Sequence, residues 1–460
     1  MLVYAAVAVL LAIPVLGANV PLGVDDLNHL ARIYVRAHID QDPDLARLFE
    51  VRSDWIPYLG MDLLLTPLAR VLPIMLVGRI YVLALAWGLV GAVVVLQRVF
   101  TSRIGLAPAA TGLVAYNGLL AWGLINYELG LILALLLFAA GATAIYLTHL
   151  LAFVLYGVLV ISYELFGRAQ PWRNPLQDWV VLAGQAVPGL LLWHALSGRM
   201  PSPELTVEYW PLGKLFALES PFLFGGTVGG LDAGILVAWF CAAMLFLGLR
   251  RGWLTWPRSV AGPVWVLLVL TVVLPYRALG VMLTDYRFAV PAVCLALAGL
   301  RLAPSARPHA RAIAAALAVL TVAHVADVAA DMHRCNDQYA ELRQALAALP
   351  RGAELTTALE WTAPEPGVAC TRLPIYLHID QLVTIDRSGY APDFFARLTS
   401  VGVRGGRATD TDPTSADAVS SAPAAGFLLW IHLGRKRPVP DGLVLLRSGS
   451  FFDLWAVALK

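Results

Sequence analysis

Two adjacent carboxylates, Asp25 and Asp26, directly follow the first apolar segment of the chain. They open the stretch VDDLNHLARIYVRAH, in which Asp25, His29, Arg32 and Arg36 recur at intervals of four and three residues. In a helix these intervals place the acid, imidazole and guanidinium side chains on one face. Because a carboxylate pair is costly to hold at the edge of a hydrocarbon slab, we interpret the pair as a candidate catalytic site at a membrane surface.

The same side chains also have structural interpretations, which stay open at this point. Asp25 or Asp26 is suited to capping the helix that follows, because aspartate accepts hydrogen bonds from the free amides of a helix N-terminus. Capping needs only one of the two consecutive carboxylates, so at least one is left for a role other than capping. His29, Arg32 and Arg36 could form a face that meets solvent or lipid headgroups.

A second set of polar residues lies at the ends of later apolar segments. His149 begins one such segment, and Arg277, Asp285 and Arg287 flank a short turn between two others. Arginines hold a departing phosphate through charge-assisted hydrogen bonds, while a carboxylate can take the proton of an acceptor hydroxyl. The alternatives are a hydrogen-bonded packing histidine and an ion pair that closes the turn.

The composition indicates which elements must position these residues. Hydrophobic residues make up 59% of the 460 residues, charged residues only 14%, and the mean hydropathy is +0.71. A soluble protein carries about a quarter charged residues, so the composition predicts a polytopic α-helical membrane protein. Segments of bilayer-crossing length predict about eleven transmembrane helices. The predicted spans are 2–19, 58–75, 79–97, 105–124, 128–147, 149–167, 178–197, 231–249, 260–279, 287–304 and 311–328.

Basic residues in short loops predict the orientation of the helices. Arginine clusters at 168–173, 250–258 and 301–311 fall on one side, which the positive-inside rule makes cytoplasmic. The first loop, 20–57, and the tail after 328 then lie outside. Asn126, Tyr127, Glu128 and Glu164 fall on the side opposite the candidate site, and we interpret them as structural.

The chain is expected to divide into a membrane domain, 1–328, and an extracytoplasmic domain, 329–460. An amphipathic stretch, ELRQALAALP, and the strand-like stretches LPIYLHI, AGFLLWIHL and FFDLWAVAL predict a small C-terminal soluble α+β domain. In the segment HIDQLVTIDRSGYAPDFF, the neighbours Asp386, Arg387 and Tyr390 are interpreted as a salt-bridged turn.

Cysteine usage and net charge exclude some partners. Cys335 and Cys370 could pair if the tail lies outside the cytoplasm, whereas Cys241 and Cys294 fall in apolar segments and are interpreted as packing residues. The absence of a CxxC motif or a Cys/His cluster in the sequence argues against a structural zinc site. A net charge of +2 and the lack of a basic, aromatic-rich stretch argue against a nucleic-acid partner.

This order of elements resembles the GT-C superfamily of membrane glycosyltransferases, especially the bacterial mannosyltransferase-like and polyprenyl-phosphate-sugar-dependent enzymes. The likeness rests on Asp25 and Asp26, with His29 and Arg32 behind them, in an outer loop after the first helix. The resemblance implies that Asp25 or Asp26 is a base or a metal-associated residue. The chain departs from the family in having Asp–Asp rather than Asp–Glu or Glu–Asp, and no clear second acidic motif follows.

The leading hypothesis is an inverting glycosyltransferase of cell-envelope polysaccharide biosynthesis, at the outer face of the bacterial cytoplasmic (inner) membrane. It would move a sugar from a polyprenyl-phosphate donor to a glycan, lipid or protein acceptor. A first-loop aspartate would be the base, and the predicted substrate- or phosphate-binding residues are His29, Arg32, His149, Arg277, Asp285 and Arg287. Whether Asp25 and Asp26 hold a divalent cation such as Mg²⁺ or Mn²⁺ stays open. The alternatives are a non-catalytic membrane subunit of a polysaccharide synthesis or export complex, and a transporter or flippase.

Overall fold

The protein is described from a computed structural model, which divides into two compact units. The helical unit comprises Met1–Pro14 and Val82–Val328, and the mixed unit comprises Val15–Tyr81 and Ala329–Lys460. Each unit is described by itself. The structure describes residues 2–21, 23–52, 58–136, 142–167, single positions between 180 and 194, 206–222, 227–228, 231–278, 281–360, 365, 367–395, 399–405, 426–435 and 442–457.

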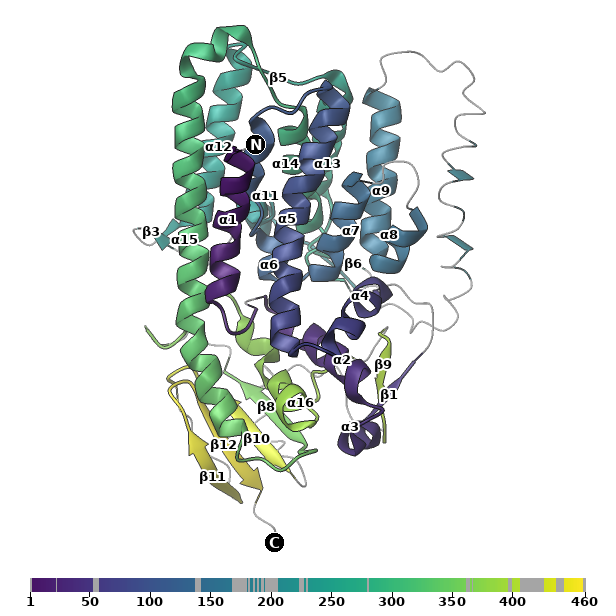
Figure 1. The fold of residues 1–460 in the computed structure, drawn as a ribbon, viewed down its shortest axis with the longest axis vertical. Helices are drawn as coiled ribbons and strands as arrows, with labels where there is room; N and C mark the ends of the chain where they lie inside the picture. The colour runs from purple at the N-terminus through teal and green to yellow at the C-terminus, as the bar shows by residue number, and fades with distance from the viewer. Residues whose placement is uncertain are drawn as a thin grey trace. The chain divides into compact units, whose positions relative to one another are not determined.

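The helical unit consists mainly of apolar helices that run side by side (Figure 1). Its helices are most of α1 (Leu2–Gly17), most of α5 (Ile74–Thr101), α6 (Gly118–Ala121), α7 (Ile125–Leu136), α8 (Ala142–Thr148), α9 (Leu150–Ser162), α11 (Gly213–Glu219), α12 (Ala233–Arg250), α13 (Arg258–Val273), α14 (Tyr286–Gly299) and the first part of α15 (Arg307–Leu346). Three antiparallel pairs of two-residue strands connect them: β2 (Val207–Glu208) with β6 (Arg277–Ala278), β3 (Thr227–Val228) with β4 (Leu231–Asp232), and β5 (Leu254–Thr255) with β7 (Arg301–Leu302).

Three helices of the described chain are long and apolar enough to cross a membrane, namely Ile74–Thr101, Leu150–Gly167 and Pro308–Leu346. Shorter apolar helices accompany them, among them α1, α7, α12, α13 and α14. A bilayer core requires long apolar helices, because only a helix satisfies all of its backbone hydrogen bonds within one segment. The expectation of a helical membrane protein is therefore met, whereas the predicted number of spans is not reproduced.

One predicted span, 105–124, is wrong. The structure has a 3-10 helix (Ala107–Leu113) and then the four-residue α6, with no continuous helix between residues 105 and 124. Asn117 explains the break, because its side chain accepts a hydrogen bond from the amide of Leu119 at 2.8 Å and so begins a new helix.

Other predicted boundaries shift for similar reasons. The predicted spans 58–75 and 79–97 become a short helix, α4 (Leu59–Ala69), and one long helix, α5. The predicted span 128–147 is divided between α7 and α8, and the predicted span 178–197 falls almost entirely outside the described residues. The last predicted span and the amphipathic stretch after it form one helix, α15, because no proline or glycine interrupts the chain from Arg311 to Leu349.

The mixed unit joins the segment after α1 to the C-terminal part of the chain. It contains α2 (Asp26–His38), α3 (Pro43–Leu48), α4, α16 (Leu382–Arg387) and a 3-10 helix, Ile375–Gln381. A short strand from each part, β1 (Phe49–Val51) and β9 (Val401–Val403), pairs antiparallel.

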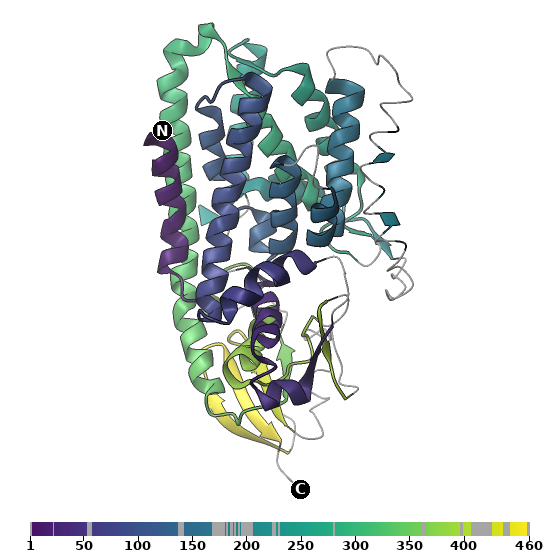
Figure 2. The same ribbon diagram turned by 45° about the vertical axis from the view of Figure 1, so that its right-hand side comes forward.

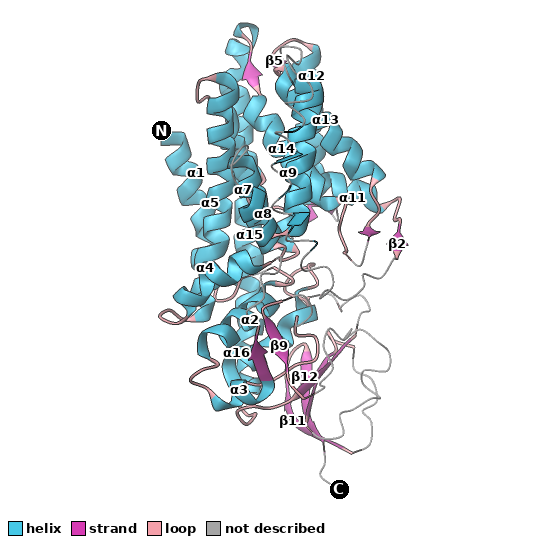
Figure 3. Ribbon diagram, turned by 90° about the vertical axis from the view of Figure 1, so that its right-hand side faces the viewer, coloured by secondary structure: helices cyan, strands magenta, loops and turns pink. Residues whose placement is uncertain are grey.

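The mixed unit also contains a four-stranded sheet, whose strands lie in the order β11-β12-β10-β8 (Figures 2 and 3). The strands are β8 (Leu355–Leu359), β10 (Phe427–Ile431), β11 (Leu443–Ser448) and β12 (Phe452–Val457). Ala358, Leu428 and Trp430 form the buried core of this sheet. The strand predictions for AGFLLWIHL and FFDLWAVAL are confirmed.

The strand prediction for LPIYLHI is wrong, because this stretch forms the 3-10 helix Ile375–Gln381. Its buried residues Ile375, Tyr376 and Ile379 recur at helical rather than alternating spacing. The helix also carries His378 at an irregular position, with φ −123° and ψ 19°.

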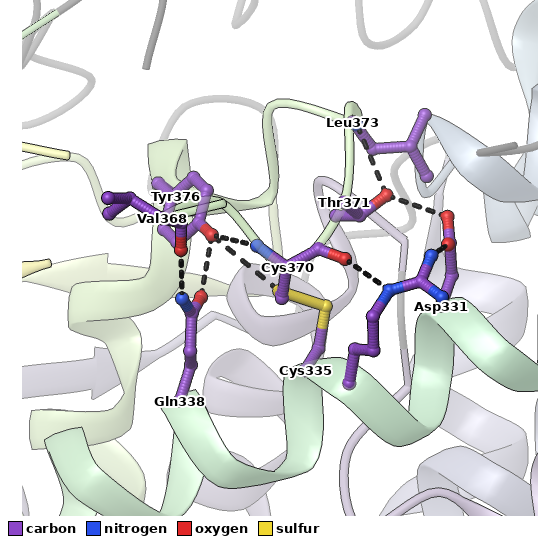
Figure 4. Close-up of a disulfide and its surroundings, with 9 residues drawn as sticks. Asp331, Cys335, Gln338, Val368, Cys370, Thr371, Leu373 and Tyr376 are labelled. Carbon is purple, nitrogen blue, oxygen red and sulfur yellow. Dashed lines mark hydrogen bonds and ion pairs between the residues drawn. A yellow bond between two sulfur atoms is a disulfide. The ribbon is translucent and has the colours of Figure 1, made fainter. Parts of the chain in front are cut away.

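A disulfide between Cys335 and Cys370 confirms the predicted pairing, with an S–S distance of 2.08 Å (Figure 4). Cys335 lies on α15, and the loop that contains Cys370 leads into the 3-10 helix. The Tyr376 hydroxyl accepts a hydrogen bond from the amide of Cys370 at 3.0 Å and donates one to Gln338 of α15 at 2.6 Å. The loop is therefore fastened to α15 by a covalent bond and by side chains on both sides of it.

Candidate active site

Asp25 occupies the N-cap position of α2, but its side chain makes no capping hydrogen bond. Its Oδ1 lies instead 3.3 Å from Nε2 of His378, in the C-terminal part of the mixed unit. The Asp25 side chain is 24% exposed and that of His378 is 13% exposed. The capping interpretation therefore does not hold for Asp25, whose carboxylate is partly open to solvent.

Asp26 has a different environment from its neighbour. The residue is only 2% exposed, and its Oδ2 accepts a hydrogen bond from the amide of Gly23 at 2.9 Å. Its buried Oδ1 has no hydrogen-bond partner among the described residues. Burial raises the pKa of Asp26 to about 7; the Gly23 hydrogen bond opposes this rise and the charge of Asp25 adds to it. Of the two predicted catalytic carboxylates, only Asp25 lies where a substrate could reach it.

His378 lies between two carboxylates. Its Nδ1 is 2.8 Å from Oδ2 of Asp393, while its Nε2 faces Asp25. Burial lowers the pKa of His378, but the hydrogen bonds and charges of Asp25 and Asp393 outweigh burial and raise that pKa to about 10. The imidazole is therefore protonated at neutral pH, and each ring N–H can donate to one carboxylate.

The hydrogen-bond network continues behind Asp393. The side-chain amide of Gln381 donates to Oδ1 of Asp393, and Thr357 donates to the buried Asp380 at 2.5 Å. Burial, followed by the charge of Asp393, raises the pKa of Asp380 well above its ordinary value. Because its pKa is raised, Asp380 adds little negative charge beside His378. The carboxylates that face the His378 imidazolium are those of Asp25 and Asp393.

His378, Asp380 and Asp393 were not predicted, although the segment that contains them was singled out. The predicted salt-bridged turn of this segment is corrected, because its residues Asp386 and Arg387 contact other elements. Asp386 forms an ion pair with Arg343 at 2.6 Å, and Arg387 donates to the carbonyl of Leu349. The only signal for the others was the presence of a histidine and two further aspartates in one short segment.

Arg32 and His29 meet on α2, as their spacing predicts, since Nδ1 of His29 lies 3.1 Å from a guanidinium nitrogen of Arg32. Arg32 is only 1% exposed, and its Nε and second terminal nitrogen reach Oδ1 of Asp62 at 3.1 and 2.9 Å. This buried ion pair argues against the predicted phosphate-binding role for Arg32 and against a headgroup-facing surface. His29 also packs edge-on against Phe395, with ring centroids 5.8 Å apart.

A second polar cluster, in the helical unit, contains His149 and Arg287. A terminal nitrogen of Arg287 lies 3.3 Å from Nε2 of His149, and its guanidinium carbon lies 5.2 Å from the centroid of the Tyr127 ring. The Nδ1 of His149 accepts a hydrogen bond from the amide of Leu151 at 3.1 Å and so caps α9. Both residues are 5% exposed. The structure thus brings together two of the predicted phosphate-binding residues.

The sequence analysis placed Tyr127 and Arg287 on opposite sides of the membrane, and this is wrong. The Tyr127 hydroxyl donates to the carbonyl of Arg287 at 2.5 Å. The error lies in the spans predicted between the two residues, because the first of them, 128–147, is divided between α7 and α8 and is not one continuous helix among the described residues. Glu128 accepts a hydrogen bond from Asn117 at 3.1 Å and is fully buried, consistent with its predicted structural role.

Asp285 caps α14 and pairs with a lysine that the sequence analysis missed. Its Oδ1 accepts from the amide of Tyr286 at 3.1 Å, and its Oδ2 lies 2.5 Å from Nζ of Lys214. Lys214 is carried by α11, which packs on this turn through Ala217. The predicted alternative, an ion pair of Asp285 with Arg277 or Arg287, is therefore replaced by a pair with Lys214.

Arg277 lies on the strand pair β2–β6, opposite Glu208 in register. Its Nε is 3.7 Å from a carboxylate oxygen of Glu208, and its side chain is 35% exposed. No group of three or more His, Cys, Asp or Glu side chains among the described residues is arranged to hold a metal ion.

The fold is that of a helical membrane protein, with polar clusters in both units. No protein-family model and no curated protein matches the sequence. Two crystal structures of ArnT from Cupriavidus metallidurans are similar to the whole chain at 13% sequence identity. The structure bound to undecaprenyl phosphate has a TM-score of 0.48 and 99% of its chain covered, and the apo structure has a TM-score of 0.49 and 98% of its chain covered. Scores this low carry no information about activity, so the function is argued from the residues.

Proposed function

We propose that the protein is an inverting glycosyltransferase that moves a sugar from a polyprenyl-phosphate donor to an acceptor hydroxyl. The observation that carries the proposal is the environment of Asp25. One of its carboxylate oxygens is held by His378, and the other has no hydrogen bond from any described residue. A partly exposed carboxylate with one oxygen anchored and one available suits a general base.

The proposed step is a single displacement at the anomeric carbon. The acceptor oxygen forms the new bond while its proton passes to Oδ2 of Asp25, and the polyprenyl phosphate leaves with the electrons of the broken bond. One accessible carboxylate is enough for such a step, whereas a covalent intermediate needs a nucleophile as well as an acid–base group. Asp26, which is buried and held by Gly23, supports the loop rather than the reaction.

A polyprenyl phosphate needs positive charge to bind, and among the predicted basic residues of the helical unit we assign this role first to Arg287. Arg277 is partly exposed and faces Glu208. Arg287 is only 5% exposed, and its guanidinium lies beside the ring of Tyr127 and the imidazole of His149. A guanidinium binds phosphate oxygens through charge-assisted, often bidentate, hydrogen bonds.

The disulfide supports an extracytoplasmic position for the mixed unit, because disulfides persist in oxidising compartments and are rare in the cytosol. We therefore place Asp25 and the C-terminal sheet at the outer face of a bacterial inner membrane. A lipid-linked donor would keep its chain in the bilayer and present its phosphate and sugar at the interface. The acceptor class, whether glycan, lipid or protein, and any role for a divalent cation are left to experiment.

The test is sugar transfer by the purified protein in nanodiscs, with a panel of polyprenyl-phosphate sugars that begins with undecaprenyl-phosphate donors. We expect the wild type to release polyprenyl phosphate and Asp25→Asn to lose about 100-fold or more of this rate. The exposed Asp40, just after α2, provides a matched control as Asp40→Asn. Equal release by the wild type and Asp25→Asn would refute the proposal, and background release by all folded variants would favour a non-catalytic subunit.

A further inference from the structure

The residue that faces Asp25 comes from the far end of the chain. His378 lies in the 3-10 helix Ile375–Gln381, at the position where the backbone departs from helical geometry. The loop before it is fixed to α15 by the Cys335–Cys370 disulfide and by the hydrogen bonds of Tyr376. The imidazole is therefore presented from an anchored segment.

The partners of His378 fix the ring on both edges. Nδ1 lies 2.8 Å from Oδ2 of Asp393 and 3.3 Å from the side-chain nitrogen of Asn28, so Asp393 is its closer partner. Asn28 in turn donates to the carbonyl of Asp393 at 2.8 Å and accepts from the amide of Phe395 at 2.8 Å. The Phe395 ring meets the imidazole edge-on, with centroids 4.9 Å apart. These contacts allow one ring orientation, in which Nε2 points to Asp25.

The charged groups around His378 favour a protonated ring. Asp25 faces it from the start of α2, and Asp393 faces it from the loop after α16. Asp380 acts on it from within the same 3-10 helix, and Asp26 lies behind Asp25. Arg32, on the helix that begins beside Asp25, is paired with Asp62. A ring with carboxylates at both nitrogens keeps both of its protons.

We propose that His378 is a positioning residue for the transfer step, holding Oδ1 of Asp25 so that Oδ2 faces the acceptor hydroxyl. This inference rests on the proposed function. In the step, the acceptor proton goes to Oδ2 of Asp25, and His378 keeps both of its own protons. Without the imidazole, the Asp25 carboxylate rotates freely and loses its neighbouring cation, and a misplacement of about 1 Å can cost about 100-fold in rate.

The experiment compares the wild type with His378→Gln and His378→Gly, as full chains in nanodiscs. We expect His378→Gly to lower kcat about 100-fold while the KM for the donor changes little, and exogenous imidazole to restore part of the rate. We also expect His378→Gln to lose less of the rate than His378→Gly, because a side-chain amide can still donate a hydrogen bond to Oδ1 of Asp25. A residue needed only for folding would give neither response.

The control is His38→Gln on α2, because the contacts of His38 among the described residues are with the carbonyl and the ring of Tyr34 in its own helix. Imidazole should not change its rate. A double-mutant cycle on thermal unfolding, with Asp25→Asn and His378→Gln, tests the pairing independently of activity. Additive effects in this cycle, or a rate of His378→Gly that imidazole does not change, would overturn the inference. No transfer by the wild type together with a non-additive cycle would instead show that the proposed function is at fault and the pairing is real.

Discussion

Arg32 and Asp62 form a buried ion pair, with 2.9 Å between the guanidinium and the carboxylate and side chains only 1% and 2% exposed. The pair ties α2 to α4, and Ser400 adds a hydrogen bond to the same carboxylate. A charge in this interior is tolerated only while its partner is present. The pair therefore fixes the position of α2, whose N-cap is Asp25, against α4.

Replacing one partner of this pair should destabilise the protein strongly. We expect Arg32→Met to lower the free energy of unfolding by about 3–5 kcal/mol, because it leaves the Asp62 charge buried without its cation. The double variant Arg32→Met/Asp62→Leu should recover much of that loss. Thermal unfolding in detergent measures both. If Arg32→Met were as stable as the wild type but weaker in phosphate binding, the phosphate-binding role predicted from the sequence would be right after all.

Asp26 should make stability depend on pH in the direction opposite to a salt-bridged carboxylate. Its pKa is raised from 3.8 to about 7, so the folded state binds the proton more tightly than the unfolded state does. Its contribution to stability is complete below pH 3.8 and is lost as the pH rises to about 7. Asp26→Asn should remove this dependence and stabilise the protein at pH 8, by at most about 4 kcal/mol.

Unfolding midpoints of the wild type and Asp26→Asn between pH 4 and pH 8 test this expectation. The difference should grow with pH and level off near neutrality. Asp25→Asn is the matched comparison, because that side chain is partly exposed and is paired with a cation. A constant difference across the range would show that Asp26 is not a buried acid.

The disulfide should stabilise the mixed unit and the segment that carries His378. Its two cysteines are separated by 35 residues, and closing such a loop typically contributes about 2–4 kcal/mol. We expect the double variant Cys335→Ser/Cys370→Ser to unfold at a lower temperature and to exchange amide hydrogens faster over residues 367–381. Reductant should lower the wild-type midpoint and leave that of the variant unchanged. Equal exchange in both proteins would mean that the hydrogen bonds of Tyr376 suffice to hold the loop.

Arg287 should matter more for donor binding than Arg277. We expect Arg287→Gln to weaken binding of undecaprenyl phosphate at least 10-fold, a loss of about 1.4 kcal/mol, because it removes a nearly buried cation. Arg277→Gln should have a smaller effect, since Arg277 is partly exposed and faces Glu208. Equilibrium binding in nanodiscs compares the two variants directly. The opposite ranking would move the phosphate site to the β2–β6 strand pair.

Features of the site that depend on local spacing could be predicted from the sequence. The common face of Asp25, His29 and Arg32 follows from helix geometry, and the apolar composition indicated a helical membrane protein. The partners of these residues could not be predicted in the same way. His378 and Asp62 reach the site through the fold, and no periodicity near residue 25 indicates them.

The errors in the predicted helices also have local causes. The stretch 105–124 has the apolar content of a span, but Asn117 satisfies amide groups locally and starts a new helix. The predicted span 128–147 is likewise divided between α7 and α8, so alternating the sides of the predicted spans did not reveal the contact between Tyr127 and Arg287. The cluster at His149 and Arg287 could be named from residue types, but its geometry required the structure.

The pairing of β1 with β9 has a consequence for the biosynthesis of the protein. Glu50, in the segment between α1 and α4, lies in register with Gly402, and Asp25 of the same segment meets His378. Both partners emerge from the ribosome long after this segment. A chain that stops before residue 378 would carry the carboxylates but not the group that orients one of them. Such a truncated product would insert its early helices but would lack a complete site. Activity is therefore expected only from chains whose synthesis has been completed.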